Sequence, residues 1–581
     1  MVTRAGVRWR LLVFLLIVGM GWGGMHASAQ STALVGPTAI NPVDSTVIPE
    51  ATILLRGDTI AAVGPSSDVT VPDGATVHEM PEAYVMPGLV DGHVHFFQSG
   101  GLYTRPDVID LRAVRPYAEE LEAIKERLPD TFRRYLRSGV TSVVDVGGPM
   151  WNLDVRARAD TMAQAPTVVT AGPLISSVSR PSLDEGDPPI LQITSPDAAR
   201  QEVREQVEAG VDLIKIWYIV GPGETPADYR PVVEATVDEA HAAGKRVAVH
   251  ATALETARAA VEAGADILVH SVSDQPVDEA FVRLLRENDV LYTPTLMVGE
   301  RYSETFAQQL DLTTAEHRIG QKTVIGSLFD LQTLPDSLVP GGIRERIASG
   351  QPVASDTTAM RNLKRLHDAG VAVAAGTDAG NIGTPHGPAL TREFELMRTA
   401  GLTPREILTT ATAGGARLMG RDDLGQLDAG TQADLLVLTR NPLTDITNTT
   451  AIHRVVKEGR VYAPDSLVAP TPEAVVRQGA NAFNARDLGG FLDSFAPDLK
   501  VYDHPNTLVS DSRSALRQEY RRLFESAPDL HLRLHDVTPI GQTVVVHETI
   551  EGLPGRDTPL TQVVLYRVTD GRIDRVWLVQ E

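Results

Sequence analysis

The feature that most constrains the fold is an alternation, repeated through the middle of the chain, of short apolar runs and segments with helical periodicity. The segments between the runs mostly end in glycine, which commonly terminates helices. Such alternation is typical of parallel βαβ units. The runs that we expect to be strands are residues 84–95, 141–147, 167–176, 212–217, 246–251, 267–271, 290–296 and 371–379. Eight such strands with outer helices predict an α/β fold centred on a (β/α)8 TIM barrel.

The predicted barrel, residues 87–420, is flanked by stretches in which short β runs alternate with turns. Residues 30–86 and 421–466 both have this character. Because isolated hairpins do not form a stable core, we expect the two flanks to fold together into one composite β-sandwich domain. Within the barrel, residues 298–369 exceed a single helix and predict extra helices over the barrel mouth. Beyond Pro470 a helix is followed by strands, which predicts a separate α+β domain over residues 471–581.

The first 29 residues have the pattern of a cleavable signal peptide. Arginines precede an apolar run from Leu11 to Met20, and Ala27-Ser28-Ala29 offers a cleavage site. The run is shorter than the ~20 residues that span a bilayer. We therefore expect cleavage after Ala29, a periplasmic or secreted protein, and no stable membrane insertion afterwards.

The composition excludes several kinds of partner and chemistry. The chain has 75 acidic and 53 basic residues, a formal net charge of -22, which repels nucleic acid and anionic membranes. The chain contains no cysteine, so disulfides, thiolate metal ligands and a cysteine nucleophile are excluded. We expect a small molecule as the partner, and no nucleic acid.

Polar residues stand at the carboxyl ends of several predicted strands, where TIM-barrel enzymes keep their active sites. His93 and His95 are two apart on one strand, so their side chains point to the same side. Three further strands end in His250, His270 and Asp378. Burying this many polar groups without a shared partner would cost several kcal/mol, and a metal ion would be such a partner. Nitrogen and oxygen ligands without sulfur suit zinc, with manganese, iron and cobalt as alternatives.

Lys215 stands among apolar residues near the end of the fourth predicted strand. One interpretation is an ammonium group paired with a carboxylate such as Asp212. The other is a carbamate, formed when the neutral amine reacts with carbon dioxide, because desolvation lowers the pKa of lysine. A carbamate has two oxygens and could bridge two metal ions. We favour the carbamate, because Lys215 lies between the two histidine pairs along the chain.

These features resemble the amidohydrolase superfamily, most closely its imidazolonepropionase-like and prolidase-like branch. The resemblance covers about residues 47–462 and rests on Gly57-Asp-Thr-Ile-Ala-Ala-Val-Gly, Met86-Pro-Gly-Leu-Val-Asp-Gly-His-Val-His, Lys215, His250, His270, Gly376-Thr-Asp378, Ala411-Thr412 and Gly425-Gln-Leu-Asp-Ala-Gly-Thr-Gln-Ala-Asp. The resemblance implies a first metal ion on His93, His95 and Asp378. It implies a second on His250 and His270, with carboxylated Lys215 bridging the two. Val269 departs from the pattern, since relatives often carry Glu before the sixth-strand histidine.

The predicted activity is hydrolysis of amide or peptide C–N bonds by an exported binuclear enzyme. Two divalent ions, zinc in the first instance, would lower the pKa of a bridging water, and Asp378 would act as general base and then general acid. The predicted catalytic residues are Asp378, Lys215 and His270. The candidates for gripping the substrate are Tyr218, Tyr292 and His386. We expect a dipeptidase or carboxypeptidase of the Xaa-Pro type that acts on small amides or short peptides.

Two other functions remain open from the sequence. One is a mononuclear hydrolase of cyclic amides or lactones, of the imidazolonepropionase-like kind, which would have no need of a bridging Lys215. The other is a non-catalytic binding protein, against which the complete ligand set speaks. The C-terminal domain loosely resembles the NTF2-like or SnoaL-like fold. That resemblance implies an accessory domain that mediates association, so we expect a homo-oligomer.

Overall fold

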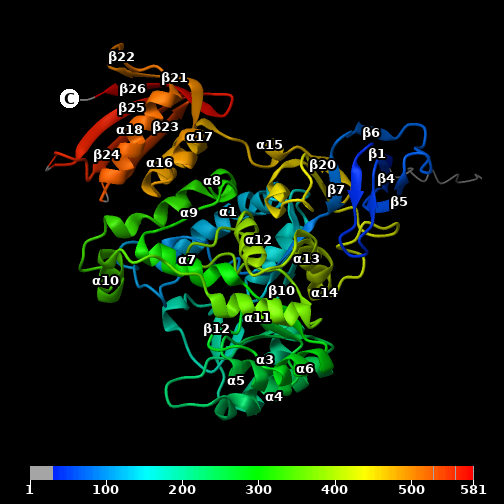
Figure 1. Ribbon diagram of the computed structural model, residues 1–581. Helices are drawn as coiled ribbons and strands as arrows, with labels where there is room; N and C mark the ends of the chain where they lie inside the picture. The colour runs from blue at the N-terminus through cyan, green and yellow to red at the C-terminus, as the bar shows by residue number, and fades with distance from the viewer. Residues whose placement is uncertain (1–30, 528, 557, 580–581) are drawn as a thin grey trace, which may run out of the picture.

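The computed structural model describes residues 31–527, 529–556 and 558–579, and it has a central α/β body with a smaller domain on either side (Figure 1). The predicted signal peptide lies outside these described residues. The strands of the central body are β8 (Leu89–Val94), β9 (Val140–Asp145), β10 (Thr167–Thr170), β11 (Leu174–Ser176), β12 (Ile190–Gln192), β13 (Ile214–Trp217), β14 (Val247–His250), β15 (Ile267–Val269), β16 (Leu291–Thr293) and β17 (Ala372–Val373).

These strands pair in parallel in two sheets. One sheet has the order β10-β9-β8, and the other the order β12-β11-β13-β14-β15-β16-β17. Two isolated parallel bridges link the sheets, Ala171 with Leu213 at one end and Val94 with Ala379 at the other. Apart from β12, which lies at the edge of its sheet beyond β11, the strands follow one another in space as they do in sequence, and their carboxyl ends lie on one side.

Helices alternate with the strands, as the glycine-terminated segments predict. The helix α3 (Pro196–Ala209) shows why the sequence folds locally in this way. The Ser195 side chain accepts a hydrogen bond from Ala198 N, Pro196 begins the first turn, and Gly210 ends the helix with a φ of 93°. The other helices of this layer are α1 (Tyr117–Arg137), α2 (Asn152–Asp160), α4 (Pro226–Ala242), α5 (Leu254–Glu262), α6 (Glu279–Glu287), α11 (Thr357–Asp368), α12 (Ala389–Thr399), α13 (Pro404–Thr409) and α14 (Gly415–Met419).

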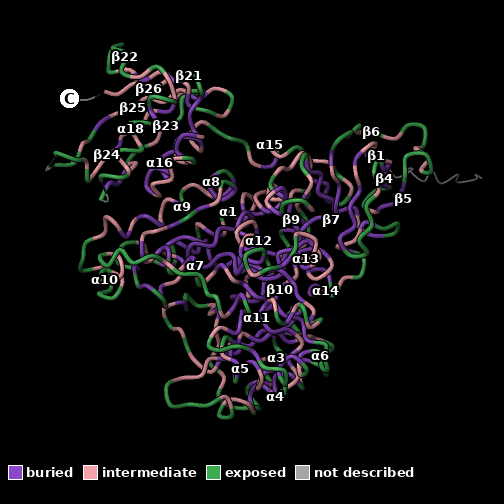
Figure 2. The backbone as a smooth tube through the Cα atoms, viewed as in Figure 1, coloured by how far each residue is buried: buried purple, intermediate pink, exposed green. Residues whose placement is uncertain are grey.

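Buried segments run through the middle of this body, and exposed ones lie at its rim (Figure 2). The expected extra helices between β16 and β17 are present. They are α7 (Leu296–Ala307), α8 (Thr314–Ile319), α9 (Lys322–Ser327) and α10 (Gly341–Ser349), followed by α11. Several residues of α7 line a cavity that lies at the carboxyl ends of the strands.

Several predicted strands differ from the observed ones. The run 167–176 divides into β10 and β11, which lie in different sheets, and the run 290–296 keeps only β16 as strand. The run 84–95 is broken at Gly88 into β7 (Tyr84–Pro87) and β8. The chain passes so close to Thr141 there that a Cβ on Gly88 would lie 2.3 Å from its Oγ1. The run 371–379 keeps only the two residues of β17 as strand. Asp378 thus follows the strand in an irregular segment, instead of ending it.

The two flanks of the barrel region share one small β domain. The strand β7 pairs with β18 (Leu435–Leu438), so that Met86 lies opposite Leu436. Leu34 and Ile53 from the first flank pack in one apolar cluster with Val437 from the second. The other strands of its two sheets are β1 (Ser31–Val35), β2 (Thr38–Ile40), β3 (Val47–Ile48), β4 (Ala51–Arg56), β5 (Thr59–Pro65), β6 (Thr76–Glu79), β19 (Ile452–Lys457) and β20 (Arg460–Tyr462).

The C-terminal domain is a six-stranded sheet with helices packed on one face. Its elements are α16 (Pro472–Asn484), α17 (Leu488–Asp493), β21 (Phe495–Asp503), β22 (Thr507–Ser510), α18 (Arg513–Ser526), β23 (His531–Ile540), β24 (Thr543–Glu551), β25 (Leu560–Thr569) and β26 (Arg572–Val579). It touches the central body through α16 and α9, where Asn481 Nδ2 donates to the Lys322 carbonyl at 2.9 Å. Across the described residues, no helix has both the length and the apolar character that crossing a bilayer requires.

Candidate active site

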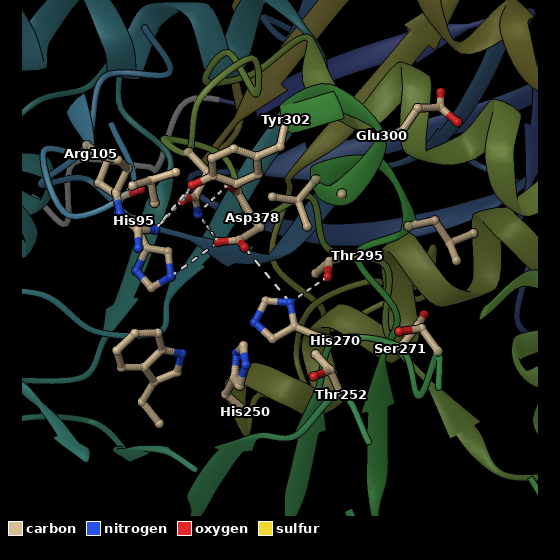
Figure 3. A pocket seen from close by; sticks show the side chains of 18 of the residues that line it. His95, Arg105, His250, Thr252, His270, Ser271, Thr295, Glu300, Tyr302 and Asp378 are labelled. Carbon is tan, nitrogen blue, oxygen red and sulfur yellow. Dashed lines mark hydrogen bonds and ion pairs between the residues drawn. The ribbon is translucent and has the colours of Figure 1, made fainter. Parts of the chain in front are cut away.

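The six residues predicted to hold metal converge at the carboxyl ends of the strands. His93 lies in β8, Lys215 in β13 and His250 at the end of β14, while His95 and His270 directly follow β8 and β15. All except His93 line one cavity, and His93 is fully buried beneath it. Figure 3 shows His95, His250, His270 and Asp378 facing this cavity.

Three of these residues form a compact triangle of ligand atoms. His93 Nε2 lies 3.3 Å from His95 Nε2. Asp378 Oδ1 lies 3.4 Å from the first nitrogen and 3.3 Å from the second. Tetrahedral zinc with bonds of about 2.0–2.1 Å has ligand atoms about 3.3–3.4 Å apart. The triangle therefore fits three protein ligands of a single metal ion.

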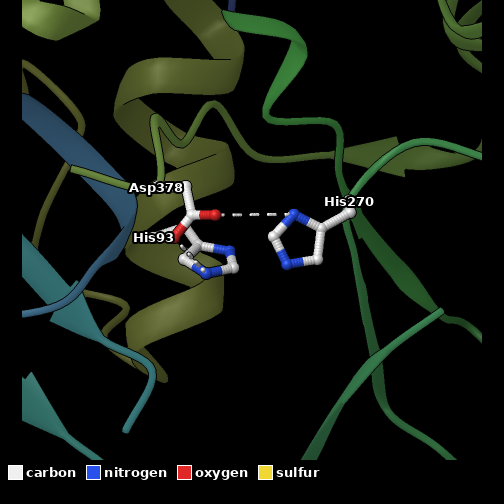
Figure 4. Close-up of side chains that lie close together, drawn as sticks. All are labelled: His93, His270 and Asp378. Atoms are coloured by element: carbon white, nitrogen blue, oxygen red, sulfur yellow. Dashed lines mark ion pairs between the residues drawn. The ribbon is translucent and has the colours of Figure 1, made fainter. Parts of the chain in front are cut away.

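Hydrogen bonds hold the rings of two of the histidines in place beside this group. His95 Nδ1 donates to the Gly147 carbonyl at 2.6 Å, which leaves Nε2 as the free acceptor. His270 Nδ1 lies 2.8 Å from Thr295 Oγ1 and 3.9 Å from Asp378 Oδ2. His93, His270 and Asp378 form a buried set of possible metal ligands, which Figure 4 shows from close by.

The remaining residues extend the site on its other side. The rings of His250 and His270 have their centroids 4.3 Å apart, and those of His93 and His270 lie 4.7 Å apart. Lys215 is 1% exposed, and within the described part of the chain its Nζ has no hydrogen-bond partner. Burial lowers the pKa of Lys215 to about 7, so a large share of the amine is neutral at neutral pH. The environment thus suits a lysine that becomes a ligand after carboxylation.

The charge states also suit metal binding. Burial lowers the pKa of His93 well below its usual value and that of His270 to about 3, so both imidazoles are neutral ligands at pH 7. Burial favours the neutral form of Asp378. The facing imidazoles outweigh this effect and hold the pKa of the Asp378 carboxyl well below its usual range.

The backbone at the site adopts a conformation that costs free energy. His270, Thr295 and Asp378 have φ angles of 73°, 45° and 61°, in the left-handed region that favours glycine. Strained residues of this kind are retained where contacts with the surrounding structure hold the backbone in place, and they gather at functional sites. Here all three belong to the same hydrogen-bonded or ion-paired group.

Two buried carboxylates hold the loops that carry the ligands. Asp91 accepts hydrogen bonds from the Thr377 hydroxyl at 2.7 Å and from Thr377 N at 3.0 Å, which ties the end of β8 to the segment before Asp378. Asp145 accepts from Phe96 N and Gly147 N, both at 3.1 Å. Each carboxylate therefore fixes the backbone beside a metal-ligand candidate.

The sequence did not predict a network behind Asp378 that joins three distant loops. Asn381 Nδ2 donates to Asp378 Oδ1 at 2.7 Å. Asn381 Oδ1 accepts from Arg105 Nη1 at 2.6 Å and from the Tyr302 hydroxyl at 2.7 Å. Since both of those groups donate to the amide oxygen, the amide nitrogen must face Asp378. No spacing in the sequence relates residues 105, 302 and 381, so this network could not be derived from it.

The three predicted substrate-gripping residues do not line the cavity. The Tyr218 hydroxyl donates to the Pro226 carbonyl, and the Tyr292 hydroxyl accepts from Val272 N at 3.0 Å. His386 bonds through Nδ1 to the Tyr135 hydroxyl at 2.7 Å and through Nε2 to the Gln98 carbonyl at 2.8 Å. The polar groups of all three side chains are therefore bonded to other parts of the protein. On β13 it is Trp217, two residues after Lys215, that faces the cavity.

The cavity itself is large enough for a drug-sized molecule. Its volume is about 690 Å³. Aromatic and aliphatic side chains form much of its wall, among them Phe97, Leu174, Trp217, Tyr302 and Phe306. A substrate could thus bury an apolar group while its reacting bond faces the histidine and carboxylate cluster.

The parallel strands and the buried histidine and carboxylate group define the class of TIM-barrel-type hydrolases with a metal-ligating centre. The sequence model of the Amidohydrolase family matches residues 84–462, and the chain belongs to this family. It is a hydrolase that acts on amide C–N bonds. The predicted fold of the C-terminal domain is confirmed as well, because residues 476–576 match the SnoaL-like domain.

Individual relatives are distant but cover most of the chain. Ochratoxinase from Aspergillus niger is 26% identical over 460 residues, which are 72% of this chain and 84% of that protein. Imidazolonepropionase from Cutibacterium acnes is 26% identical over 403 residues, 67% of this chain and 84% of the relative. Among solved structures, a putative prolidase from Bifidobacterium longum is 25% identical, with a TM-score of 0.55 over 76% of this chain and 98% of the other.

Proposed function

We propose that the protein is an exported binuclear amidohydrolase with a closed (β/α)8 barrel, which cleaves peptide-like amides as a dipeptidase or carboxypeptidase of the Xaa-Pro type. The observation that carries the proposal is the convergence of His93, His95, Lys215, His250, His270 and Asp378 on one cavity. The parallel bridges at both ends of the two sheets support a closed barrel.

The donor set supports two metal ions. The triangle of His93, His95 and Asp378 would hold the first ion, with ligand spacings that suit zinc. His250 and His270 would hold the second. Lys215 lies buried with no hydrogen-bond partner for its Nζ among the described residues, and its carbamate would supply oxygens to both ions. Bound there, the ions would supply Lewis-acid polarisation of the substrate carbonyl and activation of a water molecule.

Asp378 is the residue placed to move protons. Its Oδ1 faces His93 and His95, and Asn381 holds that oxygen by a hydrogen bond of 2.7 Å. As an ionised carboxylate it accepts the proton of the attacking water, and it then donates the same proton to the departing nitrogen. The apolar wall of the cavity excludes bulk water around this transfer.

The relatives support amide and peptide substrates. The relatives named above include an ochratoxinase and a putative prolidase. Export rests on the signal-peptide pattern of residues 1–29 alone. A secreted hydrolase of short peptides or N-acyl amino acids would scavenge such compounds outside the cell.

A mononuclear hydrolase of cyclic amides is the second candidate, because imidazolonepropionases are among the relatives. Lys215 separates the two possibilities. A site with one metal ion needs no bridging carbamate, so a buried lysine without a described hydrogen-bond partner favours the binuclear enzyme.

The test is a hydrolysis screen of the zinc-loaded full chain against dipeptides, N-acyl amino acids, cyclic amides and lactones. The proposal predicts turnover of dipeptides or N-acyl amino acids. Turnover confined to cyclic amides or lactones would favour the second candidate. A protein that cleaves none of the four classes would contradict the substrate proposal.

A further inference from the structure

One carboxylate at the edge of the cavity is shared by two arginines. Arg105 makes a bidentate pair with Asp107, with Nε 2.7 Å from Oδ1 and Nη2 2.7 Å from Oδ2. Arg180 Nε lies 3.6 Å from the same Oδ2. Arg105 also interacts electrostatically with the Asp378 carboxylate, so the two arginines face two carboxylates.

The two guanidinium groups differ in the hydrogen bonds that they have left to offer. Arg105 also gives Nη1 to Asn381 and to Tyr302, and its side chain is only 14% exposed. Arg180 is 33% exposed, and its Nη1 donates to the Ser179 carbonyl at 2.9 Å. Among the described residues, no acceptor pairs with Nη2 of Arg180. Arg180 is therefore the arginine with donors available to a ligand.

Arg180 is also held in a defined position beside the site. Its guanidinium carbon lies 4.9 Å from the ring centroid of Trp217, in a cation–π contact. Trp217 lines the cavity and lies 5.9 Å, between ring centroids, from His250. Arg105 and Leu183, three residues after Arg180, line the same cavity. Arg180 itself does not line the cavity, but it contacts Trp217, a residue of the cavity wall that neighbours the metal-ligand cluster.

We propose that Arg180, in cation–π contact with Trp217 and ion-paired with Asp107, binds a carboxylate of the substrate. Planar guanidinium groups with two free N–H donors match carboxylates, and such charge-assisted bonds are among the strong ones. The preferred substrates are then amides whose leaving amine carries a free carboxylate, namely C-terminal amino acids. Arg180 is a specificity-determining residue in this account. The inference rests on the proposed hydrolase activity and adds its recognition element.

The kinetic test compares a dipeptide with the same dipeptide amidated at its C-terminus, on the metal-loaded full chain. We expect kcat/KM to be at least about tenfold higher for the free carboxylate, as for one lost charge-assisted hydrogen bond. Arg180→Gln should raise KM for the carboxylate substrate about tenfold or more, leave kcat within about twofold, and leave the amide unchanged. Arg180→Lys should restore part of the preference. Arg112→Gln is the matched control, because Arg112 pairs with Asp110 on the same loop, 45% exposed and away from the cavity.

Binding measurements separate failure of this inference from failure of the proposed activity. Calorimetry with N-acetyl-proline and with its amide needs no turnover. Tighter binding of the acid, lost in Arg180→Gln, supports the carboxylate site even if neither dipeptide is cleaved. Equal binding or equal cleavage of acid and amide by the wild type would overturn it. An Arg180→Gln variant that loses affinity for the acid and for the amide to the same degree would also overturn it, because that result indicates a structural role.

Discussion

At the scale of single residues, the metal-ligand candidates are tied to the rest of the fold by hydrogen bonds on their far sides. His95 is fixed by the Gly147 carbonyl, His270 by Thr295, and Asp378 by Asn381. Lys215 Nζ and His93 Nδ1 are exceptions, since neither has a hydrogen-bond partner within the described residues. The cost of burying the Lys215 amine should therefore be measurable in the free energy of unfolding of the metal-free protein.

Lys215→Met is expected to stabilise the metal-free protein in buffer depleted of carbon dioxide. Methionine is apolar and of similar length, so it removes the cost of burying an unpaired amine, and the free energy of unfolding should rise by about 1 to 3 kcal/mol. The pKa of Lys215 is lowered to about 7 in the folded state, so the unfolded chain binds this proton more tightly. The gain should be complete below about pH 7 and should shrink toward pH 10.5. Urea unfolding of both proteins at about pH 6.5 and about pH 9.5 measures it. An equal gain at both pH values would contradict the assignment.

Asn381→Ala is expected to lower kcat by about 10- to 100-fold, because the lost hydrogen bond reaches a charged carboxylate. Metal content should stay unchanged, since Asn381 is not a ligand candidate. Steady-state kinetics with metal analysis of the same sample measures both. The control is Asn288→Ala, whose side chain bonds only to the Leu284 carbonyl at the surface. Loss of metal in Asn381→Ala would mean that the residue supports the ligand set rather than the proton-moving carboxylate.

The convergence of the ligand candidates could be predicted because the strand ends of parallel sheets meet at one edge, so that position in the sequence determines position in space. The substrate-facing residues could not all be found in this way. Side chains on a strand alternate between faces, and Lys215 shares its face with Trp217, which places Tyr218 on the other side. That alternation was available from the sequence. Arg105 and Asn381 lie in loops, where no periodicity fixes the direction of a side chain.

At the scale of elements, the helix α7 connects the site to the outer helix layer. It begins directly after Thr295, which bonds to His270. Glu393 of α12 is fully buried and accepts hydrogen bonds from Leu296 N and Met297 N, both at 2.9 Å. These are free N–H groups of the first turn of α7, so Glu393 acts as its cap from a distant part of the chain.

Glu393→Ala is expected to lower the free energy of unfolding by about 2 to 4 kcal/mol, because each orphaned buried N–H costs about 1 to 3 kcal/mol. Chemical denaturation measures it. Glu395→Ala on the same helix is the matched control. Glu395 lies 3.3 Å from Arg392 and is 28% exposed, so its loss should cost less than about 1 kcal/mol. Equal effects of the two substitutions would show that Glu393 does not cap α7.

The boundaries of elements were predicted less well than their order. The residues 117–138 have helical periodicity in the sequence and are followed by Gly139, and helix α1 agrees with this range within one residue because these signals are local. The segment 371–379 reads as one apolar strand, yet only β17 pairs along it. The left-handed backbone at Asp378 ends the extended conformation, and it is imposed by contacts with residues near 91–95 that no local pattern contains.

At the scale of the whole molecule, the C-terminal domain leaves one face of its sheet without a helix. The helix α16 packs against β23, β24, β25 and β26. Val544 and Val546 are buried, while the alternate residue Val545 is half-buried and aligned across the strands with Leu565 and Trp577. An apolar row on an uncovered face suits contact with a second copy of the chain.

The expected homo-oligomer can be tested on this face. Leu565→Arg should shift the protein toward the monomer by charging the apolar row, as measured by light scattering coupled to size exclusion. Val77→Arg, on a surface position 47% exposed in the β-sandwich, is the control and should leave the mass unchanged. A wild-type mass equal to one chain at all concentrations would contradict an oligomer.

We propose that six residues hold two metal ions at the strand ends, with Lys215 bridging them. The most direct test is elemental analysis of metal bound per chain, for the wild type and for Lys215→Ala after identical purification. We expect two divalent ions per wild-type chain, and the loss of at least one ion and of most activity in Lys215→Ala. A wild type that retains no metal, or a Lys215→Ala variant that keeps two ions and full activity, would contradict it.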